Sequence, residues 1–245
     1  MRKVVEASRR DWSVPMKALA IVAMLIAAPA ASVLAQSAPP ATPAPAPTPL
    51  TRAPGETPVP GKCLFQQDLD LIEARRTLTR TTLNNDVPVP FNPDYLVGRW
   101  SFEYDTPESA LGPAGLLSGT QTVQHVSGCL YEGTTQAKGP AGAFTIKSTI
   151  VYDPSAHYMV VLERDSRGFE MLKTGRVGGD SGGYFTHHWQ TAPLTVKGKK
   201  VKLKGTTFMA SPVNYRVRTE IAEGEGPFIS MGTVWIQRQA PPGAK

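Results

Sequence analysis

The chain has 245 residues, of which 41% are hydrophobic and 19% charged, enough for one sizeable core or two small ones. A mean hydropathy of −0.20 and a single apolar run near the N-terminus exclude a polytopic membrane protein, because each spanning helix needs about 20 apolar residues. Residues 1–35 hold five of the 26 basic residues and two of the 20 acidic residues, so they carry +3 of the formal charge of +6. The rest of the chain has 21 basic and 18 acidic residues, a balance that does not indicate nucleic-acid binding. Five lysines between positions 197 and 204 straddle a glycine turn, a pattern typical of a charged hairpin edge.

Residues 1–35 have the pattern of a secretory signal peptide. Lys17 precedes an apolar run from Ala18 to Ala28, and Val33-Leu34-Ala35 suits cleavage before Gln36. The apolar run, about 11 residues, is too short to span a bilayer by itself. We therefore predict a periplasmic or secreted protein with no stable membrane insertion after the signal is cleaved. A retained anchor is the alternative.

The basic residues upstream of this run have two interpretations. Ser8-Arg9-Arg10-Asp11-Trp12 resembles the twin-arginine motif, which implies export after folding. Alternatively, Met16 is the true start, or these residues are the basic flank of an ordinary signal.

Two segments without strand-like alternation precede the main domain. Residues 36–60 hold nine prolines among Ala and Thr, which predicts an extended, disordered linker. Residues 61–91 are expected to form one helix, from Cys63 to Arg76, followed by a connector. The helix is indicated by Phe65, Leu69 and Ile72, which would share one of its faces. Residues 240–245 are expected to be a disordered tail.

Residues 92–239 alternate between apolar and polar side chains with the period of a β-strand. Trp100, Phe102 and Tyr104 would share one face of the first strand. No helical crossover separates the strands, so neighbours must pair as antiparallel hairpins. Closure into a barrel removes the exposed edges of such a meander. The predicted fold is therefore all-β, an up-and-down barrel of about eight to ten strands with the N-terminal helix packed on it. The expected strands are 99–104, 120–126, 129–136, 144–152, 157–164, 169–177, 184–191, 201–209, 213–221 and 228–238.

The start of this domain carries a recognisable motif. Asn92-Pro93-Asp94-Tyr95-Leu96-Val97-Gly98-Arg99-Trp100 resembles the opening Gly-x-Trp strand of lipocalin-like barrels. With the strand succession up to Arg238, the chain is similar to a bacterial family of exported or cytosolic proteins of unknown function with a lipocalin-like, or calycin-like, barrel. The resemblance implies that Gly98 permits a tight turn into the strand, that Trp100 seals the closed end, and that Arg238 covers Trp100. These three roles are structural rather than chemical.

The sequence contains one string that resembles a catalytic motif. Gly179-Asp180-Ser181-Gly182-Gly183 spells the nucleophile loop of chymotrypsin-like proteases, but His125 stands only 56 residues upstream and two six-stranded barrels do not fit before Ser181. A flexible hairpin loop explains the string better.

His187 and His188 are adjacent on a strand and point to opposite faces, so they cannot bind one metal ion together. We predict no catalytic residues and no metal site. A pair of inward carboxylates stays open, with candidates Glu103, Glu132, Glu163 and Glu170.

The interior of the predicted barrel suggests a function in binding. Phe185, His187 and Trp189 share the more apolar face of their strand, so His187 is expected to face inward. We predict that the interior binds a small, largely apolar molecule without any cofactor. The alternatives are an enzyme on the same barrel with His187 or a buried carboxylate as its acid or base, a haem protein with His187 as the ligand, and an interaction module of the cell envelope. The expected lining residues are Trp100, Phe102, Phe144, Ile146, His187, Trp189 and Tyr215.

The chain has two cysteines, Cys63 and Cys129. In an oxidising compartment after export they can form a disulfide, which would hold the N-terminal helix across the barrel. The alternative is a pair of buried free thiols, because the sequence does not show whether the two residues approach each other.

Overall fold

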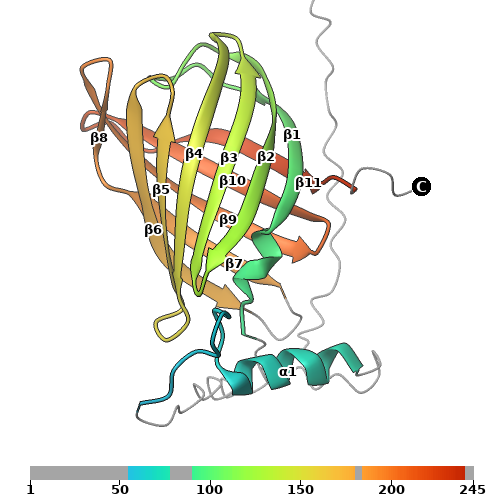
Figure 1. Cartoon of the computed structure of the whole chain (residues 1–245). Coiled ribbons are helices and arrows are strands. Elements are labelled where there is room, and N and C mark those ends of the chain that lie inside the picture. The colour runs from blue at the N-terminus through green and yellow to red at the C-terminus, as the bar shows by residue number, and fades with distance from the viewer. Residues whose placement is uncertain (1–54, 78–89, 180–183, 241–245) are drawn as a thin grey trace, which may run out of the picture. The chain divides into compact units, whose positions relative to one another are not determined.

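A computed structural model describes residues 55–77, 90–179 and 184–240 of the chain (Figure 1). The expected signal peptide, most of the proline-rich linker, the Asp180–Gly183 part of the protease-like string and residues 241–245 of the expected tail lie outside the described residues.

The described residues form ten antiparallel strands that close into a barrel, which confirms the predicted fold class. Each strand pairs with the next along the chain from β1 to β7; β7 pairs with β9, and β9, β10 and β11 follow in order. The last strand returns to the first, with Arg238 opposite Trp100 in the β11–β1 register. The strands are β1 (Gly98–Thr106), β2 (Gly115–Ser127), β3 (Leu130–Gly139), β4 (Gly142–Asp153), β5 (Tyr158–Asp165), β6 (Phe169–Gly179), β7 (Phe185–Thr191), β9 (Lys199–Ser211), β10 (Asn214–Glu223) and β11 (Ile229–Arg238).

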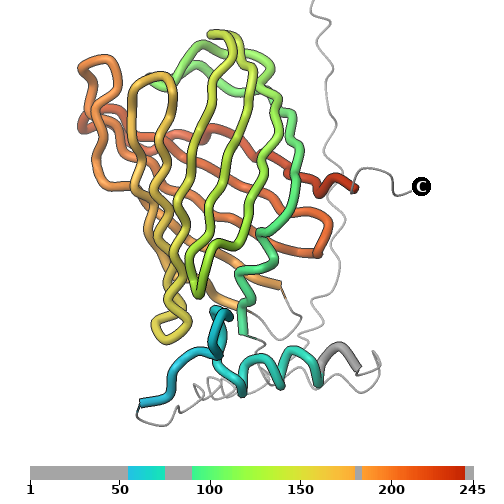
Figure 2. Tube along the Cα trace, viewed as in Figure 1, coloured from blue at the N-terminus to red at the C-terminus, as the bar shows by residue number. Residues whose placement is uncertain are grey.

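Figure 2 shows the two walls of this barrel, with the trace of β9, β10 and β11 running obliquely behind that of β3, β4 and β5. Buried and exposed side chains alternate most regularly along β3, as expected for a strand with one face inside a barrel. An additional short strand, β8 (Leu194–Val196), pairs with the beginning of β9 and extends one end of the barrel.

Several strands are longer than their apolar alternation predicts. Strand β2 begins at Gly115 rather than at residue 120, because its backbone pairs with β1 as far as Thr106. Strand β9 likewise extends to Lys199 and Ser211, where pairing with β8 and β10 continues the ladder. Backbone hydrogen bonds therefore set these ends, and the side-chain pattern does not reveal them.

Within residues 55–77 and 90–97, two short helices precede the barrel. The helix α1 (Gln66–Thr77) begins three residues later than predicted, because residues 59–64 form a turn in which the Val59 amide donates to the Leu64 carbonyl at 3.0 Å. Leu69 and Ile72 pack against the core, as their shared face predicts. A 3₁₀ helix, η1 (Pro93–Leu96), was not predicted; the Asn92 side chain caps it by accepting from the Asp94 amide. None of the helices among the described residues has both the length and the apolar composition needed to cross a bilayer.

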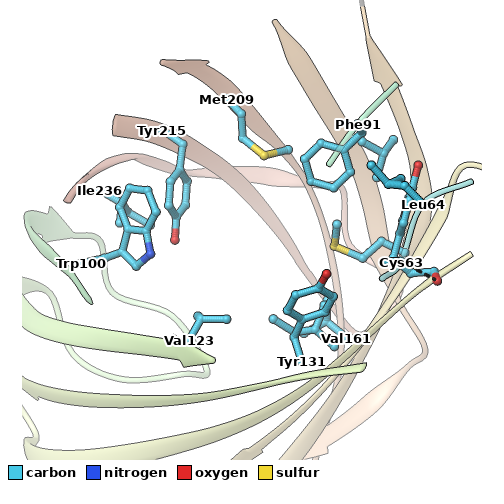
Figure 3. Close-up of a cluster of buried hydrophobic side chains, with 14 residues drawn as sticks. Cys63, Leu64, Phe91, Trp100, Val123, Tyr131, Val161, Met209, Tyr215 and Ile236 are labelled. Carbon is cyan, nitrogen blue, oxygen red and sulfur yellow. Dashed lines mark hydrogen bonds between the residues drawn. The ribbon is translucent and has the colours of Figure 1, made fainter. Parts of the chain in front are cut away.

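The buried side chains form two clusters at opposite ends of the barrel. The first contains Trp100, Tyr131 and Tyr215, together with Cys63 and Leu64 from the segment before α1. Figure 3 shows Trp100, Tyr215 and Ile236 on one side of this cluster and Phe91, Leu64 and Cys63 on the other. The second contains Met171, Trp189, Leu203, Ile221 and Met231, drawn from the parts of β6 to β11 at the other end. A disulfide joins Cys63 to Cys129, which confirms the predicted pairing.

Candidate functional site

A cavity of about 310 Å³ lies inside the barrel between the two core clusters. Its wall is mainly aliphatic and aromatic, and a few polar groups interrupt it, which is the usual construction of a small-molecule site. The lining residues come from η1, from the loop after β1 and from every barrel strand except β3. Its apolar residues include Leu96, Phe102, Leu117, Ile146, Ile150, Met159, Val161, Met171, Trp189, Leu203, Met209, Val217, Met231, Val234 and Ile236.

The structure places five of the seven predicted lining residues in this wall: Phe102, Ile146, His187, Trp189 and Tyr215. Phe144 instead lines a smaller hollow of about 170 Å³ between the loops that follow β1, β3 and β5. Trp100 does not line the cavity. It lies deeper in the first core cluster, where its side chain is fully buried.

Gly98, Trp100 and Arg238 meet at the end of the barrel where β1 and β11 pair. The guanidinium carbon of Arg238 lies 4.3 Å from the centre of the Trp100 ring system, a cation–π contact. Gly98 has a φ of +136°, and a Cβ there would come within 2.4 Å of Arg238 Nη1. Arg238 also donates to the carbonyls of Tyr95 and Val97. Glycine is therefore required at position 98, and the arrangement is the one that the Gly-x-Trp resemblance implies.

An ion pair lies in the otherwise apolar wall. Lys173 Nζ is 2.7 Å from Glu163 Oε2, and both side chains are largely buried. Lys173 also lies over the Trp189 ring system, 5.1 Å from its centre. Of the four glutamates considered as inward carboxylates, Glu163 lines the cavity, whereas the other three are exposed. Sequence reasoning missed Lys173, although it continues the inward alternation of Phe169 and Met171 along β6.

Trp189 is accommodated because the strands on either side of it carry glycines. Gly175 in β6 and Gly205 in β9 are its cross-strand partners. A Cβ on Gly205 would come within 2.4 Å of Trp189 Cζ2, so the indole lies directly over the bare backbone. The Trp189 ring therefore lies against the backbone of the barrel wall and does not project into the middle of the barrel.

His187 faces the cavity beside this ion pair. The residue is only 4% exposed, and in the part of the chain that the structure describes its Nε2 atom has no hydrogen-bond partner. Burial, followed by the positive charge of Lys173, lowers the pKa of His187 to about 4. The imidazole is therefore neutral at pH 7.

This buried imidazole predicts a pH-dependent stability. The unfolded chain binds a proton at His187 below pH ~6.5, whereas the folded protein does so only below the folded pKa of about 4. His187 should therefore lower the free energy of unfolding by about 2 kcal/mol between pH 7 and pH 4.5. Urea unfolding at both pH values checks this expectation. The His187→Gln variant should lack this component, and the adjacent outward-facing His188→Gln should retain it. Equal pH dependence in all three proteins would contradict the expectation.

Tyr215 supplies a further polar group in the wall, besides Glu163, Lys173 and His187. Its hydroxyl donates to Gln121 Oε1 at 2.8 Å across the cavity end near Trp100. Burial raises the pKa of Tyr215, so the phenol stays protonated at neutral pH. Unlike His187 Nε2, this hydroxyl already has a partner.

The end of the barrel next to the smaller hollow is covered by the loop between β1 and β2. The amide of Ala110 donates to Glu223 Oε1 at 2.6 Å, and Arg167 Nη1 donates to the Leu111 carbonyl at 3.2 Å. Arg167 is itself held by an ion pair with Asp165 and lies 3.8 Å from the centre of the Phe144 ring. Leu111 lines both the cavity and the hollow, so this loop contributes to the walls of both.

His125, the histidine weighed as a protease residue, has a local structural role. Its ring stacks on Tyr131 at 4.6 Å, and its Nε2 lies 2.7 Å from the Gly128 carbonyl. The described residues contain no group of three His, Cys, Asp or Glu side chains placed to hold a metal ion.

No protein-family model matches the chain, and no curated protein matches it significantly. Among solved structures, the crystal structure of Rv2717c from M. tuberculosis is similar, with a TM-score of 0.50 and 11% sequence identity. The alignment covers 60% of this chain and 94% of that chain. At this level of identity, the likeness shows the barrel fold alone.

Proposed function

We propose that this protein binds a small, largely apolar molecule inside its barrel. The observation that carries the proposal is the cavity of about 310 Å³ with its mainly apolar wall. Each methylene group that moves from water into such a wall contributes about 0.8 kcal/mol. A cavity of about 310 Å³ lies at the lower end of the range for small-molecule sites, about 300–1,000 Å³.

We propose further that the barrel is lipocalin-like and that it acts outside the cytoplasm. The contact between Arg238 and Trp100 supports the first point. The disulfide supports the second, because such bonds persist in oxidising compartments. The signal-like pattern of residues 1–35 agrees with both the disulfide and the expected periplasmic or secreted location.

A haem was the alternative that an inward histidine suggested. An unpartnered imidazole nitrogen suits iron ligation. However, the cavity of about 310 Å³ is at the lower end of the sizes that hold drug-sized ligands, and a haem is larger than most of those. The cavity therefore supports a small apolar ligand better than a haem.

An enzyme on the same barrel is supported less well than a binding protein. A general base works best when its pKa lies near the operating pH, whereas burial lowers the pKa of His187 to about 4. Glu163, the inward carboxylate beside it, is paired with Lys173. These groups suit the recognition of a ligand better than proton transfer.

Filling part of the cavity with a larger side chain should weaken binding. Val234 lines the cavity from β11, and its neighbour Thr233 is exposed on the outer face of the same strand. We expect N-phenyl-1-naphthylamine, a neutral apolar probe, to fluoresce on binding to the wild type. Val234→Trp should weaken its binding at least about tenfold, because losing two methylene-sized contacts costs about 1.6 kcal/mol.

Thr233→Trp is the matched control, with the same new side chain on the outer face. It should bind the probe as the wild type does, and far-ultraviolet circular dichroism should verify that both variants fold. Equal probe affinity in the two variants would overturn the interior location of the site. Native mass spectrometry of the freshly purified wild type would also detect any ligand carried through purification.

A further inference from the structure

We infer that the bound molecule carries one uncharged hydrogen-bonding group, a hydroxyl, and that this group pairs with His187 Nε2. The inference rests on the proposed binding function and specifies the chemistry of the ligand. It follows from three features of the cavity wall: an unpartnered nitrogen, a neutralised charge and a neutral imidazole that can either donate or accept a hydrogen bond.

The first feature is the unpartnered nitrogen. Buried side-chain polar atoms in proteins nearly always have a hydrogen-bond partner, and leaving one without a partner destabilises the fold. His187 Nε2 is buried with no hydrogen-bond partner among the described residues, although the residue lines the cavity. A polar group on a ligand in the cavity would supply that partner.

The second feature is the balance of charge around His187. Among the described residues, the charged side chains that line the cavity are Glu163 from β5 and Lys173 from β6, and they neutralise each other at 2.7 Å. His188, on the same strand, points to the outer face. A carboxylate or ammonium group on the ligand would lose its hydration without gaining an unpaired counter-charge. The wall therefore favours an uncharged head group.

The third feature is the ambivalence of a neutral imidazole. Its Nε2 atom is either an N–H donor or a lone-pair acceptor, depending on the tautomer. A hydroxyl can pair with either form, because it both donates and accepts. Thr207, the cross-strand partner of His187 on β9, also lines the cavity and presents a second hydroxyl close to the same position.

Three rigid molecules of matched shape test the inference at pH 7: naphthalene, 2-naphthol and 2-naphthoate. Each is close to the size that the cavity allows. They carry no polar group, an uncharged hydroxyl and a carboxylate, respectively. Isothermal titration calorimetry would give their affinities for the wild type, for His187→Phe and for His188→Phe, the matched control on the outer face.

The quantity to compare is the ratio of the 2-naphthol affinity to the naphthalene affinity, because the apolar contribution cancels in it. This ratio should fall about tenfold in His187→Phe and stay unchanged in His188→Phe. In the wild type, 2-naphthoate should bind most weakly of the three. An unchanged ratio in His187→Phe would overturn the pairing, and a preference for 2-naphthoate would overturn the uncharged head group.

A measurement on the wild type keeps the inference testable if His187→Phe fails to fold. The ¹⁵N chemical shift of His187 Nε2 should move further with 2-naphthol than with naphthalene, because only 2-naphthol forms the hydrogen bond. Equal shifts would overturn the pairing. If neither naphthalene nor N-phenyl-1-naphthylamine binds, the proposed function itself fails. That result differs from naphthalene binding without any preference for the hydroxyl.

Discussion

Replacing Trp100 with alanine is expected to lower the free energy of unfolding by about 3 to 5 kcal/mol. Trp100 is fully buried, and its ring contacts Tyr215 at 4.9 Å and the Arg238 guanidinium at 4.3 Å. Its Nε1 atom donates to the Leu96 carbonyl at 2.9 Å. The alanine variant would leave a large void, an unpaired carbonyl and a guanidinium without its aromatic partner. Urea denaturation followed by circular dichroism would measure the loss.

Trp235 provides the control for this prediction. It lies on β11, but its side chain is 52% exposed on the outer face, where the Arg216 guanidinium lies 5.8 Å from its ring centre. Removing an exposed aromatic ring from such a contact should cost no more than about 1 kcal/mol. Equal destabilisation by Trp100→Ala and Trp235→Ala would contradict the prediction that the buried contacts of Trp100 contribute more to stability than the exposed contact of Trp235.

Much of the barrel could be predicted because its strands alternate clearly. In β1, the shared face of Trp100, Phe102 and Tyr104 already indicates which side chains point inward. The short strand β8 could not be found in this way, since three residues are too few to establish a period. The helix η1 is specified by capping and by a proline at its start, and neither produces a hydrophobic pattern.

The candidate site was only partly predictable, for a different reason. His187 could be assigned to the interior because Phe185 and Trp189 lie on the same face of its strand. Lys173 could not, because a lysine on a strand ordinarily faces solvent. Its inward position becomes understandable only when Glu163 on the neighbouring strand is known to reach it. That contact depends on strand register, which the hairpin between β5 and β6 sets.

The existence of the cavity lay beyond sequence reasoning altogether. A ten-stranded barrel can be filled by its own side chains or can leave space for a ligand. Here the outcome depends on close packing in the wall, such as the Trp189 ring lying over Gly205. Composition gives the number of glycines but does not show which large side chain each one accommodates.

Removing the disulfide is expected to lower the free energy of unfolding by about 4 kcal/mol, since the bond closes a loop with a sequence separation of 66 residues. The change is the double variant Cys63→Ser with Cys129→Ser, measured by urea denaturation against the oxidised wild type. The ten-strand ladder excludes the segment around Cys63, so the barrel should still form. Adding a reducing agent should destabilise the wild type to the level of the variant and leave the variant unchanged.

The size of this effect also tests how firmly the segment before α1 is attached. Leu64 is only 2% exposed and belongs to the first core cluster, so it buries apolar surface against the barrel without help from the bond. The full loss of about 4 kcal/mol is expected only if this segment stays docked until the barrel unfolds. In that case the crosslink restricts the unfolded chain and does not restrict the folded one. A loss below about 1 kcal/mol would contradict the prediction. It would mean that the segment detaches in a separate, earlier step.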